Sequence, residues 1–284
     1  MGTPYKNFRI YLNSEDGTQQ STELGTDILF NFVQAIDAPA AHHFEFSLAY
    51  AGIPASFYNV NKFTYQLFYT YDVDGIPGVV NLTYGYYTLD ELITALNAGQ
   101  NKMTFTLSSV TGKVTVTSAN VNLFITSSST VTKLLGFEPS TDYNIGGIGD
   151  SVTSPGVADV TYTRAIYVVC DQLPNSCMDS RNLRNTTRVI AVIPNNVGFK
   201  GVIHYTPGKD YNLRVNVESI STLAIKFQDD EENTIDMNNG TWCLVLDIHI
   251  VPDDPENVRA VDQQTLSNRY MQKHFGFIHP KTDF

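Results

Sequence analysis

The chain has 284 residues, of which 42% are hydrophobic, 12% aromatic and 17% charged. This length suits one large β domain or two smaller ones, and the apolar content is sufficient for a sizeable core. There are 18 Lys and Arg against 29 Asp and Glu, which gives a formal net charge of −11. The molecule as a whole therefore repels nucleic acid and anionic membrane surfaces, and we expect no direct nucleic-acid partner.

Cysteine usage and hydropathy indicate a protein made and used in the cytosol or in an assembly built there. Cys170, Cys177 and Cys243 form neither a disulfide framework nor a CxxC metal spacing, so reduced thiols are expected. The N-terminus lacks the basic segment and apolar run of a secretory signal, and no apolar stretch reaches membrane-spanning length. We expect no membrane span.

The first 84 residues are predicted to hold the opening strands of a β-sandwich. Residues 28–36 are apolar and aromatic, and in 44–50 apolar side chains alternate with small or polar ones. Two-residue alternation is typical of a strand with one buried face. Pro54 cannot donate to a sheet partner, so we expect the ladder to break there and to resume over 63–71.

An amphipathic helix is predicted next, in the stretch GYYTLDELITALNAG at residues 85–99. Thr88 and Glu91 have the spacing of a capping box, and Gly99 stands where a left-handed C-terminal cap is expected. The apolar stripe at helical spacing consists of Leu89, Leu92, Ile93 and Leu96. We interpret this helix as a structural cover for an apolar face.

A hairpin and a second, shorter helix follow. Alternation over 103–117, with a Thr-Gly turn in its middle, predicts two antiparallel strands. Ser129 is expected to cap a helix over 130–135, which Gly136 ends. The two helices and the hairpin together predict a compact α+β module.

Residues 138–160 contain several Gly and Pro residues and show no periodicity, so a long loop is expected there. We assign this loop, with the helix-hairpin-helix segment before it, to one inserted module over 85–160. A loop as long as 138–160 needs a functional or assembly reason.

The β pattern returns over residues 161–252, which we assign to the remaining strands of the sandwich. Strands are expected at 166–170, 189–193, 201–205, 213–217, 223–227 and 242–251. Many strands separated by turns, with few helices, favour an all-β fold, and we predict a jelly-roll β-sandwich.

Composition changes in residues 253–284, where the acidity of the body is lost. Tyr270, Phe275 and Phe277 are spread among basic residues there. One interpretation is a C-terminal arm that docks on a neighbouring molecule through these aromatics. The alternative is a strand or helix packed on its own domain.

A search for catalytic or metal-binding residues finds only weak candidates. Asp247 and His249 share one face of the last strand and could form an acid/base or metal pair, but a third ligand is lacking. His42 and His43 are adjacent and so point to opposite faces of a strand, and we expect them at the surface. No catalytic, cofactor or metal residue is therefore predicted, and we do not expect an enzyme.

The only dense basic group lies at Arg181, Arg184 and Arg188. In so acidic a chain, these arginines are more readily explained by carboxylate partners in a charged interface than by nucleic acid. We therefore take them, with the aromatics of the arm, as candidate interface residues.

The assembled pattern resembles the minor capsid, or penton, proteins of virophages and Polinton-type viruses. The features that carry the resemblance are the run 85–97, the hairpin 103–117, the Leu-Leu-Gly-Phe of 134–137 and the strands at 166–171, 188–193 and 242–251, in that order. The resemblance covers roughly residues 28–251. It implies a jelly-roll subunit that forms homopentamers at the vertices of an icosahedral virion, contacts the major capsid protein and is assembled in the host cytoplasm. The resemblance implies no catalytic residues for this chain.

A second hypothesis remains open beside the capsid role. A β-sandwich with 16 Tyr and a single Trp, Trp242, could present aromatic faces to a carbohydrate or a host receptor. The oligomeric state in solution separates the two hypotheses, because only the capsid subunit requires a ring of copies.

Overall fold

The computed structural model describes residues 6–161, 163–173, 177–178, 186–208, 212–215 and 217–253. The fold is mostly β, with several antiparallel sheets. The strands are β1 (Lys6–Asn13), β2 (Thr18–Gln19), β3 (Ile28–Asp37), β4 (His42–Pro54), β5 (Gln66–Tyr71), β6 (Ile76–Asn81), β7 (Met103–Leu107), β8 (Val114–Ser118), β9 (Leu123–Ile125), β10 (Tyr143–Gly146), β11 (Ser151–Thr153), β12 (Ala165–Cys170), β13 (Cys177–Met178), β14 (Thr186–Thr187), β15 (Val189–Pro194), β16 (Val202–Tyr205), β17 (Leu213–Val215), β18 (Ser219–Gln228) and β19 (Cys243–Pro252). The helix is α1 (Leu89–Ala98), and short 3-10 turns occur at η1 (Ser14–Asp16) and η2 (Val131–Leu135).

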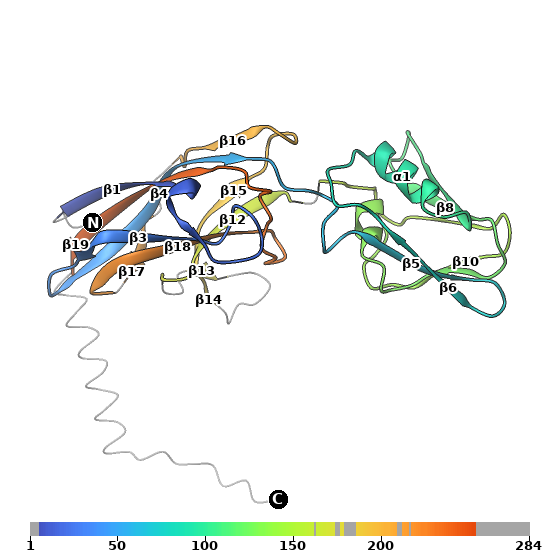
Figure 1. Ribbon diagram of the computed structural model, residues 1–284, viewed down its shortest axis with the longest axis horizontal. Helices are drawn as coiled ribbons and strands as arrows, with labels where there is room; N and C mark the ends of the chain where they lie inside the picture. Colours follow the sequence, from blue (N-terminus) through green and yellow to red (C-terminus); the bar gives the residue numbers. More distant parts are fainter. Residues whose placement is uncertain are drawn as a thin grey trace, which may run out of the picture.

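Two sheets form a sandwich around the larger core (Figure 1). One sheet has the order β1-β19-β4, with both β16 and β17 paired to β4, and the other has the order β15-β12-β18-β3-β2. The predicted alternation of the last strand is confirmed: Leu244, Leu246, Ile248 and Ile250 of β19 are all buried. Period-two burial is what places one face of each strand in the core.

The strands of the sandwich pair as four nested antiparallel pairs. The outermost pair in the sequence is β1 with β19, followed inward by β3 with β18, β4 with β17, and β12 with β15. Each of these pairs joins segments that lie progressively closer in the chain. These four pairs, taken from the outermost inward, lie alternately in the two sheets.

The chain between β4 and β12 forms a second unit with its own core. Its sheets have the orders β10-β9-β5-β6 and β11-β8-β7, and α1 packs beside β7. The separate core runs from Val60 to Phe137 and Ile145, with Val160 packed against it. Figure 1 shows this unit joined to the sandwich by two chain segments.

The second unit begins earlier than the boundary expected at residue 85. Leu67 and Val80, on β5 and β6, are buried in the second core and not in that of the sandwich. The alternation over 63–71 correctly indicates a strand, but it does not indicate which sheet the strand joins. Pairing of β5 with β6 and β9 decides that question.

Helix α1 begins where its capping box predicts. The Thr88 side chain accepts from the Glu91 backbone N–H, and the Glu91 carboxylate accepts from the Thr88 N–H at 2.8 Å. The prediction for Gly99 is wrong, because this residue has a right-handed φ of −75°. Glycine suits this position for a steric reason instead, because a Cβ atom on residue 99 would lie 2.6 Å from Cγ1 of Val80.

Three other local expectations differ from the structure. Ser129 does not cap the second short helix, a 3-10 turn, because its hydroxyl donates to the carbonyl of Phe68 and accepts from the Phe68 N–H, both at 2.9 Å. Pro54 does not break β4 but ends it, where a missing donor is tolerated. The stretch 138–160 is not a continuous loop, since it contains β10 and β11.

Candidate functional site

The residues that the sequence offers for acid/base chemistry have other partners in the structure. Asp247 accepts two hydrogen bonds from the Arg9 guanidinium, at 2.7 and 2.8 Å, and these bonds lower the pKa of the carboxyl group. His249 contacts Oδ1 of Asn7 through its Nδ1, at 2.9 Å. Both side chains therefore link β19 to the edge strand β1.

His43 was expected at the surface but is buried, with an exposed fraction of 5%. Its Nδ1 lies 2.8 Å from Oδ1 of Asp253, and its Nε2 lies 3.5 Å from Oε1 of Glu45. Arg214 binds the same oxygen of Asp253, at 2.7 Å. Within the ranges described, no group of three or more His, Cys, Asp and Glu residues is arranged to hold a metal ion.

Of the six predicted interface residues, the structure describes one. Arg188 is half-exposed and donates from Nη1 to the carbonyl of Asp171 at 2.8 Å, with the Asp171 carboxylate 3.6 Å away. Asp171 belongs to the same chain, so the expectation of carboxylate partners in a charged interface stays a prediction. Arg181, Arg184, Tyr270, Phe275 and Phe277 lie outside the described residues.

The contacts across the seam between the sandwich and the second unit include two ion pairs and an aromatic stack. Lys62 forms an ion pair with Glu23, and Lys133 forms one with Glu231. On another part of the seam, the ring of Tyr86 stacks on Phe199 with centroids 4.4 Å apart and planes within 2°. Each contact joins a residue of the second unit to a loop of the sandwich.

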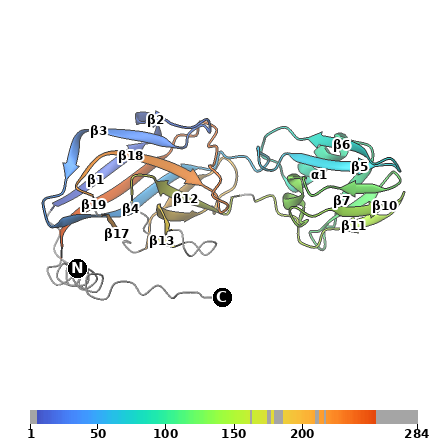
Figure 2. The same ribbon diagram turned by 90° about the horizontal axis from the view of Figure 1, so that it is seen from below.

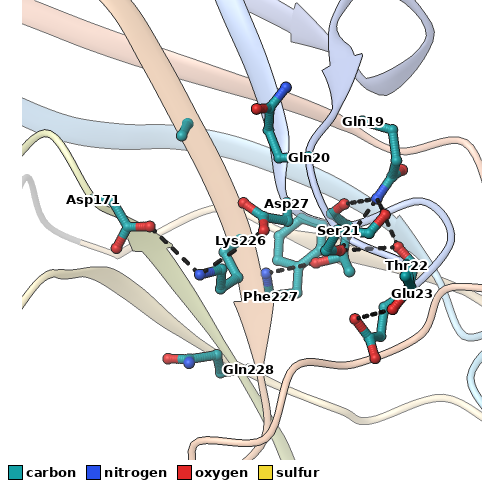
Figure 3. A network of polar contacts seen from close by, with 12 residues as sticks. Gln19, Gln20, Ser21, Thr22, Glu23, Asp27, Asp171, Lys226, Phe227 and Gln228 are labelled. Atoms are coloured by element: carbon teal, nitrogen blue, oxygen red, sulfur yellow. Dashed lines mark hydrogen bonds and ion pairs between the residues drawn. The ribbon is translucent and has the colours of Figure 1, made fainter.

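The loop that carries Glu23 is fixed by a polar network (Figure 3). Nε2 of Gln19 donates to the carbonyls of Glu23 and Thr26, at 2.7 and 2.5 Å. Below it, the Lys226 ammonium lies between Asp171 and Asp27, at 3.4 and 4.0 Å. The Lys62 ammonium, by hydrogen bonding, lowers the pKa of the Glu23 carboxyl.

Two cavities open along this seam. One, of about 130 Å³, is lined by the aromatic rings of Phe57, Tyr58, Phe63 and Tyr84 together with polar residues of both units. The other, of about 200 Å³, lies beside the stacked pair of Tyr86 and Phe199. The single Trp242 is 1% exposed and offers no binding face, because its ring packs edge-on against Phe30 and Phe227 and its Nε1 donates to the Gly25 carbonyl.

Exposed apolar side chains occur on both long sides of the sandwich. On one side, the side chain of Tyr11 on β1 is 73% exposed and that of Val33 on β3 is fully exposed. Val192 on β15 and Val202 on β16 are exposed on the other, at 44% and 47%. Among these strands β1 was not predicted, although the alternation of Phe8, Ile10 and Leu12 with polar or exposed residues is a signal from which it could have been found.

Comparisons with known proteins return structural similarity alone. No protein-family model matches the chain, and no curated protein matches it. Among solved structures, the chain is similar to the crystal structure of the mavirus penton protein, with 11% sequence identity and a TM-score of 0.46. The match covers 87% of this chain and 100% of the mavirus chain.

Proposed function

We propose that this chain is a structural capsid subunit, which forms homopentamers at the vertices of an icosahedral virion and contacts the major capsid protein there. The single observation that carries the proposal is the strand order of the sandwich. With the edge strands β2 and β16 left out, the other eight strands of the sandwich can be numbered in chain order. Their first, eighth, third and sixth strands then make one sheet (β1-β19-β4-β17), and the second, seventh, fourth and fifth make the other (β3-β18-β12-β15). This order supports a jelly roll, a plan used by viral capsid domains.

The position of the second unit supports the same role. It is inserted between β4 and β12 and lies at one end of the sandwich (Figure 1). The long sides of the sandwich are therefore left open to neighbouring subunits. In this proposal the chain acts through repeated contacts between subunits and not through chemistry, in a virion assembled in the host cytoplasm.

A second candidate function is the binding of a carbohydrate or a host receptor. The observation that favours it is the aromatic lining of the cavity at the seam, with Tyr58, Phe63 and Tyr84 beside polar side chains. Aromatic rings next to hydrogen-bonding groups suit the binding of a sugar ring.

The part of the chain that the structure describes has no helix long and apolar enough to cross a membrane.

The mass of the protein in solution tests the proposal. Light scattering is expected to give a particle of five chains, each of 31.6 kDa, and negative-stain microscopy is expected to show five-fold rings. A monomer at every concentration tested, together with binding on a glycan array, would instead support the second candidate.

A further inference from the structure

The sandwich has two open sides formed by edge strands. On one side, β1 passes through η1 to β2, so the edges of both sheets meet there together with β3. On the other side, β15 ends one sheet and continues through residues 195–201 to β16 at the edge of the other sheet. Figure 2 shows β2 and β3 along one margin of the sandwich and β12 and β17 toward the opposite margin.

The first side is dominated by an uncovered stretch of β3. The short β2 pairs with only Ile28 and Leu29, so within the described chain the outer edge of β3 beyond them has no strand partner. The register with β18 shifts between Ile220 and Thr222, which places residues 32–35 of β3 opposite one residue of β18. This bulge turns Val33 fully to solvent.

The second side presents two further edges. In the described part of the chain, residues 190–194 of β15 pair with no strand other than β12, and β16 pairs only with β4. An unpaired edge leaves a row of backbone N–H and C=O groups, which is a template for pairing with another chain. Val192 and Val202 add exposed aliphatic surface to these edges.

Charged side chains are scarce along these edges. The chain carries a net charge of −11, so two copies repel each other unless they meet where charged residues are scarce. Residues 28–36 of β3 contain no charged side chain, and neither do residues 189–194 of β15. The only ionisable groups of β16 are those of His204 and Tyr205.

We propose that the two sides are complementary halves of one interface between copies of this chain, in which the β3 bulge of one subunit packs on the β15–β16 side of the next. The inference rests on the proposed capsid role and names the surfaces that would close its ring. A ring of identical subunits requires a heterologous contact, in which two different surfaces of the subunit meet. Edges on opposite sides of the sandwich satisfy that requirement, and each covers the other's unpaired backbone.

Two charged variants test the inference, one for each side. Val33→Asp damages the first side, and Val192→Asp with Val202→Asp damages the second. These three side chains are exposed, so the substitutions should leave the fold intact. Circular dichroism of each variant checks that the fold is retained. By light scattering, each variant alone is expected to be monomeric at concentrations where the wild type is assembled.

Mixing the two variants provides the decisive measurement. The Val33→Asp chain keeps its β15–β16 side, and the double variant keeps its β3 side, so an equimolar mixture is expected to form heterodimers that cannot extend further. The matched control is Val110→Asp, which changes an equally exposed valine in the second unit and is expected to assemble as the wild type does. The milder Val33→Ala is expected to raise the concentration of half-assembly several-fold.

The outcomes separate this inference from the proposed function. If the wild type is a pentamer and the charged variants keep that mass, the assigned surfaces are wrong and the capsid role stands. A mixture of the two variants that remains monomeric also overturns the inference. If the wild type itself is monomeric, the proposed function fails first, and the inference fails with it.

Discussion

At the scale of single residues, the two cysteines whose side chains the structure describes differ in environment. Cys170 lies in the core of the sandwich, and burial raises the pKa of its thiol to about 11, whereas Cys243 is exposed at the start of β19. Because the thiolate is the reactive form, we expect Cys243 to react with a disulfide reagent at pH 8 and Cys170 to react only after unfolding.

The measurement is a thiol titration with and without denaturant, in a Cys177→Ser background that leaves only these two thiols. Cys243→Ser in the same background is the control, and it should remove the rapid phase. Rapid reaction of two thiols in the native protein would show that Cys170 is not buried as the structure has it.

Residue environments were predictable from the sequence only where they follow a local pattern. The burial of Leu246 and Ile248 follows from alternation along one strand. The burial of His43 does not, because it depends on Asp253, which lies 210 positions further along the chain. The contact of Arg188 with Asp171 joins residues 17 positions apart, and spacing alone does not identify such a partner.

At the scale of the element, α1 provides a test of its cap. Removing the hydroxyl in Thr88→Ala leaves the Glu91 N–H without its side-chain acceptor. We expect the free energy of unfolding to fall by about 1 kcal/mol, the usual effect of losing such a cap. Denaturant unfolding measures the change, and Thr88→Ser, which restores an acceptor, should recover most of it. An equal loss in the serine variant would show that the methyl group matters and the cap does not.

The elements found from the sequence are those with a strong local signal. Helix α1 combines a capping box with an apolar stripe, and β19 alternates over its whole length. The strands β10 and β11 are only 4 and 3 residues long, too short for alternation to distinguish them from a loop. Their place is set by pairing with β9 and β8, which is tertiary information.

At the scale of the whole molecule, the division of the chain into two cores was only partly predictable. The sequence indicates an insertion, but its true start lies before β5, because that strand pairs inside the second unit. No local pattern distinguishes a strand that joins one sheet from a strand that joins another. The seam between the two units therefore could not be anticipated either.

The last prediction concerns the contacts across the seam between the two units. Two ion pairs, Lys62 with Glu23 and Lys133 with Glu231, cross it beside one aromatic stack. Their members are partly exposed, so the pairs should add little to stability, about 1 kcal/mol or less each. Because both pairs join the second unit to loops of the sandwich, they should nevertheless help to fix the orientation of the second unit. The double variant Glu23→Gln/Glu231→Gln is expected to broaden the distribution of molecular dimensions measured by small-angle X-ray scattering, with little change in melting temperature.

Asp247→Asn removes an ion pair within the sandwich and serves as the matched control. An unchanged distribution in the double variant would mean that the Tyr86–Phe199 stack and the two connecting segments hold the orientation without the charges.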